Sequence, residues 1–152
     1  VALSPDQRFL LVAETGAFRI LRYWVDGSRP EPLEVLLADL PGYPDNVSAG
    51  LGGRFWVALV APRSRVLETY AGRPFWRRVM VRLPEAFRPQ PEAYGHLIAI
   101  DGQGRVMENL QDPTPDYPLI TSVTETRQVL YLGSLAAPGL GRYPKRLAGL
   151  IP

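Results

Sequence analysis

The strongest chemical signal in the sequence is an acid and an amide placed side by side at the end of the run Leu40-Pro41-Gly42-Tyr43-Pro44-Asp45-Asn46. The Asp45 carboxylate and the Asn46 amide carbonyl are hard oxygen donors, which suit Ca²⁺ or Mg²⁺. The chain has no cysteine and a single histidine, so a zinc site is poorly supported. We therefore predict that Asp45 and Asn46 bind a divalent cation. The alternative is that the two residues only shape a Pro-Asp-Asn turn.

Four weaker candidates each have a structural interpretation that we favour. His96, the only histidine, stands at the start of an apolar strand and could be a general base or a buried structural group. Glu14 could support a metal site or be an exposed acid at a strand end. The run Gly50-Leu51-Gly52-Gly53 lacks the lysine and helix of a phosphate-binding loop, which favours a hairpin turn. Asn46-Val47-Ser48 matches the glycosylation sequon, but an asparagine that faces a metal cannot readily carry a glycan.

The composition indicates a folded domain built from strands. The 152 residues are 46% hydrophobic and 21% charged, and Gly and Pro together make up 30 of them (14 plus 16). Proline breaks helices and suits turns, so this content favours short strands joined by many turns. The net charge of +2 is too small to predict a nucleic-acid partner, and the lack of cysteine excludes disulfides and thiolate catalysis.

The ends of the chain give little information about its location. No apolar run approaches the ~18 residues of a membrane-spanning helix. The sequence starts Val1-Ala2-Leu3, with neither an initiator methionine nor a basic leader. We therefore expect the chain to begin inside a longer protein, which leaves an upstream anchor or signal open.

Three segments of strand-forming residues resemble one another, which indicates an internal repeat. Their cores are Phe9–Glu14 with Arg19–Trp24, Arg54–Leu59 with His96–Ile100, and Val129–Leu135 with Gly141–Tyr143. Phe9 and Phe55 are 46 positions apart, and Phe55 and Leu130 are 75 apart. If residues 62–95 are an insertion, the second spacing falls to about 42, and both spacings match a propeller blade.

An extended segment precedes each repeat core, which brings each unit to the four strands of a propeller blade. These segments end at Leu3 or run over 45–49 and 119–125. About 2.5 to 3 units are present, whereas a closed propeller has four to eight blades. We therefore predict an all-β fold in which residues 1–152 form the C-terminal part of one propeller domain. In such a fold Asp45 starts an innermost strand, which lines the central channel.

The predicted insertion contains the only helical pattern, over about 66–84. Pro74 suits a first helical turn, and apolar residues recur from Phe75 to Leu83 opposite Arg77, Arg78 and Arg82. A helix with Phe75 and Trp76 on one face and arginines on the other could rest on an anionic membrane surface. The simpler alternative, which we favour, is a helix across a blade edge with its arginines in water.

Several runs in the same order resemble strictosidine synthase-like proteins, which belong to the gluconolactonase and paraoxonase superfamily. These runs are 1–6, 12–15, 19–24, 40–46, 55–59, 73–76, 120–123 and 130–135. The resemblance covers nearly the whole chain. It implies a six-bladed propeller whose central channel holds a divalent cation, most commonly calcium. Asp45 then matches a metal-binding aspartate and Asn46 the asparagine beside it, while the other ligands are expected upstream of residue 1.

One departure from the family bears on activity. Strictosidine synthase uses a glutamate that aligns with Thr121, and a threonine cannot exchange a proton near neutral pH. The resemblance therefore predicts a calcium-dependent hydrolase of lactones or esters, with Asp45 as ligand and possible base. The alternatives are a non-catalytic, membrane-associated propeller with a structural ion and, less favoured, amine–aldehyde condensation through another acid.

Overall fold

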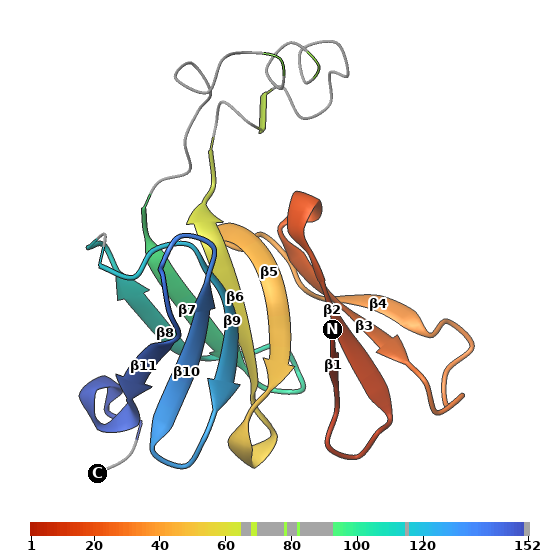
Figure 1. Cartoon of the computed structure of the whole chain (residues 1–152). Helices are drawn as coiled ribbons and strands as arrows, with labels where there is room; N and C mark the ends of the chain where they lie inside the picture. The colour runs from red at the N-terminus through yellow and green to blue at the C-terminus, as the bar shows by residue number, and fades with distance from the viewer. Residues whose placement is uncertain (65–67, 70–77, 79–81, 83–92, 115, 151–152) are drawn as a thin grey trace.

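The computed structural model describes residues 1–64, 68, 69, 78, 82, 93–114 and 116–150. It contains three antiparallel sheets, each built from strands that follow one another along the chain (Figure 1). The first sheet consists of β1 (Ala2–Leu3), β2 (Phe9–Glu14), β3 (Arg19–Trp24) and β4 (Leu33–Leu37). The second consists of β5 (Gly42–Ala49), β6 (Phe55–Pro62), β7 (Gly95–Ile100) and β8 (Val106–Asp112). The third consists of β9 (Ile120–Glu125), β10 (Val129–Ser134) and β11 (Gly141–Pro144).

This arrangement is that of three neighbouring blades of a β-propeller, as the sequence predicts. The first strand of each sheet, β1, β5 or β9, is the inner strand, and β5 packs against both β1 and β9. Three short 3₁₀ turns complete the described elements: η1 (Thr15–Ala17), η2 (Leu51–Gly53) and η4 (Lys145–Ala148). The Gly50–Gly53 run is the turn between β5 and β6, which agrees with the hairpin interpretation.

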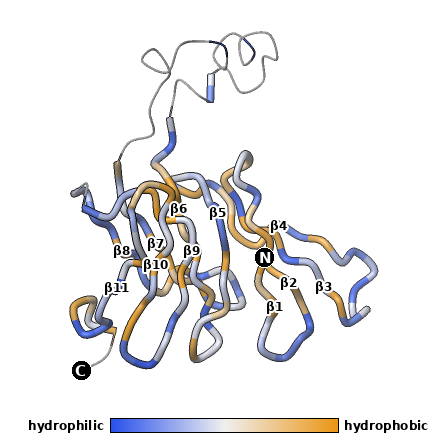
Figure 2. Tube along the Cα trace, in the orientation of Figure 1, coloured by the Kyte–Doolittle hydropathy of each residue, from blue (hydrophilic) through white to orange (hydrophobic). Residues whose placement is uncertain are grey.

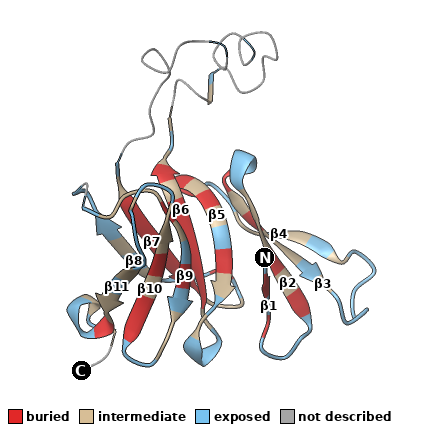
Figure 3. Cartoon of the chain, viewed as in Figure 1, coloured by how far each residue is buried: buried red, intermediate tan, exposed pale blue. Residues whose placement is uncertain are grey.

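The second sheet is buried on both faces because it lies between the other two. Strand β7 is buried at every position, and β6 is buried at six of its eight (Figure 3). Side chains on a strand alternate between its faces. Phe55, Val57 and Leu59 therefore pack toward the first sheet, whereas Trp56 and Ala58 pack toward the third. A strand buried on both faces reads as an unbroken apolar run, which is the pattern of residues 55–61.

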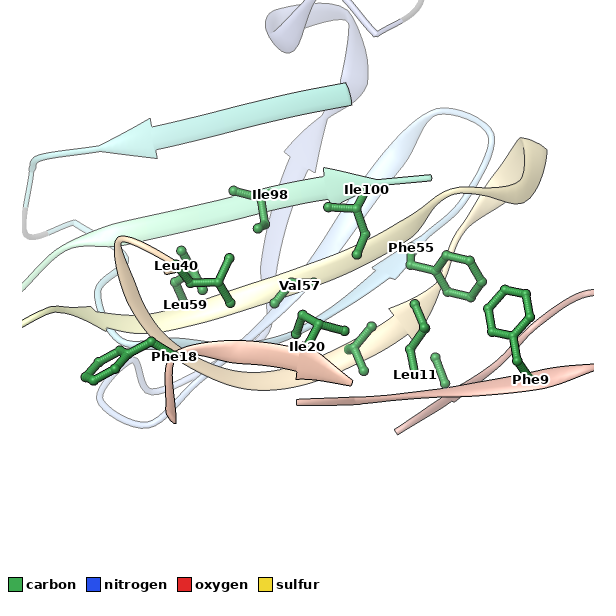
Figure 4. Close-up of a cluster of buried hydrophobic side chains, with 12 residues drawn as sticks. Phe9, Leu11, Phe18, Ile20, Leu40, Phe55, Val57, Leu59, Ile98 and Ile100 are labelled. Carbon is green, nitrogen blue, oxygen red and sulfur yellow. The ribbon is translucent and has the colours of Figure 1, made fainter. Parts of the chain in front are cut away.

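The core between the first two sheets is aliphatic with aromatic ends (Figure 4). Phe9 and Phe55 meet at a ring-centroid distance of 5.9 Å, and Leu11 and Ile20 are fully buried. Polar residues gather instead in the loops that join β3 to β4 and β9 to β10 (Figure 2). The outer strands are less buried: β8 is exposed at five of its seven positions, and β4 is exposed at two of its five and half-buried at the other three.

The hairpin between β7 and β8 contains a position that only glycine can occupy without strain. Gly104 has φ +80°, and a Cβ there would lie 2.7 Å from the carbonyl oxygen of Leu36. The Asp101 carboxylate accepts hydrogen bonds from the N–H groups of Gln103 and Arg105 and closes the turn. This hairpin therefore packs directly against the chain that leaves β4.

The chain between β6 and β7 departs from the sheet after Pro62 and returns at Gly95. These two strands pair from Phe55 with Ile100 to Leu59 with His96, so the blade continues across the interruption. This is the place where the repeat spacing predicts an insertion. Most of the helix predicted within it, including Phe75, Trp76 and Arg77, lies outside the described residues; Glu68, Thr69, Arg78 and Arg82 are the described residues of its range.

Candidate metal centre

Asp45 and Asn46 lie on the inner strand β5, in an irregular part of its pairing with β6. Pro44 pairs with Leu59 and Val47 pairs with Val57. Two residues on β5, Asp45 and Asn46, therefore lie opposite one residue on β6, Ala58. One extra residue in one strand is a β-bulge, which bends the strand and redirects its side chains. The two predicted ligands are the residues of this bulge.

The bulge is connected by hydrogen bonds to the blades on both sides. The Thr15 hydroxyl, in η1 of the first sheet, donates to the Pro44 carbonyl oxygen at 2.7 Å. The Asn46 side-chain amide donates to the Thr121 carbonyl oxygen on β9 at 3.0 Å. Ser48 makes a similar bond to the Val123 carbonyl oxygen. The segment that carries Asp45 is therefore bonded to η1 of the first blade and to β9, the inner strand of the third.

The Asp45 carboxylate is half-buried and has no hydrogen-bond or ion-pair partner among the described residues. Its neighbour Asn46 is exposed and donates its amide hydrogen to Thr121, which leaves its carbonyl oxygen available as an acceptor. Two hard oxygen donors thus stand next to each other on the inner edge of the middle blade. This is the kind of donor that calcium binds.

These donors fit calcium in kind, but they are fewer than a complete site needs. Calcium takes six to eight oxygen ligands. Among the residues that the structure describes, no group of three or more Asp, Glu, His or Cys side chains is placed to hold a metal. Of the described residues, Asp45 and Asn46 are therefore the donors that could form a share of such a site.

Thr121, the residue that aligns with the synthase glutamate, lies beside the candidate centre. It is half-buried on β9, and its carbonyl oxygen accepts the hydrogen bond from Asn46. The inner strand of the third blade thus brings the backbone of this position against Asn46, the neighbour of Asp45. Its hydroxyl cannot act as the proton donor and acceptor that a carboxylate there would be.

His96 lies away from the candidate centre. It is on β7, which is separated from β5 by β6, so about 10 Å of sheet lies between the two strands. Its side chain is buried, and Nε2 lies 2.8 Å from the Asn109 side-chain oxygen. Burial lowers the pKa of the His96 imidazole, and the hydrogen bond with Asn109 offsets only part of this effect. The location is that of a structural histidine.

Glu14 also makes its contacts outside the bulge. Its carboxylate forms an ion pair with Arg19 at 2.6 Å across the turn between β2 and β3, and both side chains are partly exposed.

Two arginines of the predicted basic helix, Arg78 and Arg82, are among the described residues, and both are exposed. Within the described part of the chain, no helix has the length and apolarity needed to span a membrane.

A buried ion pair was not indicated by any sequence pattern. Glu125, at the end of β9, is fully buried, and its carboxylate accepts hydrogen bonds from Lys145, Trp56 and the backbone N–H of Leu51. Burial opposes ionisation of Glu125, but these hydrogen bonds outweigh it and lower the pKa of the carboxyl group. The residues are far apart in sequence, and only the packing of two blades brings them together.

An apolar cavity of about 240 Å³ lies between the second and third sheets. Its lining includes Leu97, Leu110, Tyr117 and Tyr143. The Tyr117 hydroxyl is occupied: its single hydrogen faces the carbonyl oxygens of Leu132 and Gly139, at 2.7 and 2.8 Å, and its oxygen accepts from the N–H of Gly141. The cavity is lined by β7 and β8 on one side and by the third sheet on the other. Its lining does not include the bulge that carries Asp45.

Comparison with known proteins places the chain among longer relatives. Adipocyte plasma membrane-associated protein of Bos taurus is 33% identical over 151 residues, which cover 93% of this chain and 36% of that protein. Strictosidine synthase-like 10 of Arabidopsis thaliana is 34% identical over 154 residues, covering 94% and 40%. Strictosidine synthase-like 13 of the same plant is 37% identical over 117 residues, covering 74% and 29%. No protein-family model matches the chain.

A solved structure supports the fold. The luciferin-regenerating enzyme matches 99% of this chain and 37% of its own chain with a TM-score of 0.54 and 20% identity. This likeness concerns the arrangement of strands. Together with the curated relatives, it shows that the chain spans between about a quarter and two fifths of the proteins that it resembles.

Proposed function

Because this chain is homologous to the strictosidine synthase-like and adipocyte plasma membrane-associated proteins and forms part of a β-propeller, we propose that it contributes Asp45 to a calcium-dependent hydrolase of lactones or esters. The observation that carries the proposal is the half-buried Asp45 carboxylate, which has no partner among the described residues and lies on a bulge that is hydrogen-bonded to the first and third blades. Asn46 supplies a second oxygen, and the remaining ligands come from the rest of the longer protein.

In the proposed reaction, a water molecule attacks the carbonyl carbon of a lactone or ester. Asp45 accepts a proton from this water as the carbon–oxygen bond forms. The bond to the leaving oxygen then breaks, and that oxygen takes up the proton, which gives an acid and an alcohol. A bound calcium ion supplies Lewis acidity that polarises the carbonyl group. Thr121 in place of the glutamate argues against amine–aldehyde condensation.

The test is hydrolysis of lactones and aryl esters by the full-length protein, with and without a chelator. Asp45→Asn keeps the shape of the side chain and removes its charge, so we expect turnover to fall by at least about 100-fold. Asp116→Asn is the control, because it makes the same change of side chain at an exposed loop acid away from the bulge. Turnover that is indifferent to both the chelator and Asp45→Asn would refute the proposal.

A second candidate is a non-catalytic propeller that contacts a membrane surface and holds a structural ion. Two observations favour it: the name of the animal relatives and the exposed Arg78 and Arg82 within the predicted basic helix. Co-sedimentation with anionic liposomes tests it when Arg77, Arg78 and Arg82 are changed to Glu. Membrane binding that survives these changes would count against the helix.

A further inference from the structure

The candidate ligand Asp45 makes no hydrogen bond of its own in the described structure, so its position depends on the backbone that carries it. The carbonyl group of Pro44 and the N–H group of Asp45 belong to one planar peptide unit. A hydrogen bond that fixes the Pro44 oxygen therefore also orients the backbone of Asp45. The Thr15 hydroxyl makes such a bond, at 2.7 Å, from the neighbouring blade.

The turn that holds Thr15 is fixed by an unusual residue. Phe18 follows η1 with φ 52°, a left-handed conformation that is costly for a bulky side chain. Its ring is buried and packs against Tyr43 at a centroid distance of 4.7 Å, and the Arg63 guanidinium lies 4.1 Å from the ring centroid. The Leu40 N–H also donates to the Phe18 carbonyl oxygen. These contacts to the second blade and the chain before it hold the turn against β5.

The opposite side of the bulge is held by the third blade. Asn46 donates its side-chain hydrogen bond to the Thr121 carbonyl oxygen. The bond from Thr15 to Pro44 and the bond from Asn46 to Thr121 thus tie the chain to two neighbouring blades, one residue before Asp45 and one after it. A bulge held on both sides keeps one geometry, whereas a bulge held on one side could relax and turn Asp45 away.

We propose that Thr15 is a positioning residue for Asp45, and that its hydroxyl sets the direction in which the bulge presents the carboxylate. The part of this inference that concerns calcium rests on the proposed function. The part that concerns the geometry of the bulge does not, because the Thr15–Pro44 contact can be removed and measured without any metal.

The test compares three variants of the full-length protein. Thr15→Val keeps the shape of the side chain but removes the hydroxyl, whereas Thr15→Ser keeps the hydroxyl. Thr126→Val is the matched control, because the Thr126 hydroxyl also donates to a backbone carbonyl, that of Val129 in the β9–β10 turn. The rate of hydrogen exchange over residues 42–49, measured in chelator, shows how firmly the bulge is held. Calorimetric titration measures the affinity for calcium, and thermal unfolding measures overall stability.

We expect Thr15→Val to speed exchange in 42–49 and to weaken calcium binding by about three- to tenfold, the effect of losing one hydrogen bond. Thr15→Ser should restore both, and Thr126→Val should change neither. Unchanged exchange in Thr15→Val would overturn the proposal, and so would calcium affinity equal to that of the wild type. If the wild type binds no calcium, the proposed function fails, and the exchange measurement alone decides the role of Thr15.

Discussion

Replacing Lys145 with methionine should destabilise the protein strongly, because it removes one partner of a buried ion pair. The Lys145 Nζ atom lies 2.6 Å from the Glu125 carboxylate, and the two side chains are 5% and 0% exposed. Methionine fills similar space but removes the cation that bonds the buried carboxylate, which keeps only the more distant Arg54, with its Nε 4.0 Å away, as an ion-pair partner among the described residues. Breaking a buried pair in this way costs about 3–5 kcal/mol. The neutral donors Trp56 and Leu51 N–H remain, so we expect a loss near the lower limit of that range.

Urea unfolding of the full-length protein measures this loss. The double variant Glu125→Leu with Lys145→Met removes both charges, and it should recover most of the stability that the single variant loses. Arg105→Met is the control, because the Arg105–Asp101 pair has a similar distance of 2.7 Å but an Arg side chain that is 79% exposed. Its loss should stay below about 1 kcal/mol.

The pH dependence gives an independent check of the same ion pair. The pKa of folded Glu125 is below its ordinary value of 4.5, so the folded state favours the ionised carboxyl group more than the unfolded chain does. The resulting stability is complete above pH 4.5 and is lost as the pH falls through the lowered pKa. Glu125→Gln should remove this dependence.

Two results of the unfolding experiment would contradict the reasoning. One is a loss of stability in Lys145→Met no larger than that in Arg105→Met. The other is a double variant that loses as much stability as Glu125→Leu and Lys145→Met added together.

Three further predictions concern other parts of the fold. The pKa of His96 is lowered by burial, so its stabilising contribution is complete above its ordinary pKa of 6.5 and is lost below it; the melting temperature of His96→Leu should fall less than that of the wild type between pH 7.5 and 5.5. Gly104→Ala should cost more than about 1 kcal/mol in urea unfolding, because it strains a left-handed residue against Leu36, whereas Gly16→Ala, with nothing within 4 Å, should be tolerated. Residues 1–152 alone should aggregate through the exposed Leu3, Leu33 and Val35 of the first sheet, and a compact monomer in light scattering would contradict this expectation.

The sequence predicts the inner and middle strands because burial leaves a clear pattern there. Strands β6 and β7 are buried on both faces, so their residues form apolar runs whose repeat gives the blade spacing. The inner strands β5 and β9 fall where extended segments precede each repeat core. The outer strand β8 has a mixed, mostly exposed sequence, whereas β4 is short and apolar and has no repeat partner that identifies it as a fourth strand.

The candidate site is only partly predictable for a different reason. Asp45 and Asn46 are adjacent in sequence, so their pairing is visible without a structure. The Thr15 contact to Pro44 joins two blades, and the Glu125 contact to Lys145 joins two segments of the third blade. Each forms only when distant parts of the chain fold together. The calcium site, the catalytic role of Asp45 and the basic helix remain predictions.

The most direct test of the central claim is a crystal structure of the full-length protein grown with calcium. We predict an ion on the channel axis, with an Asp45 carboxylate oxygen within about 2.3–2.6 Å of it. An Asp45 side chain that points into bulk solvent, with the ion elsewhere or absent at saturating calcium, would contradict the claim.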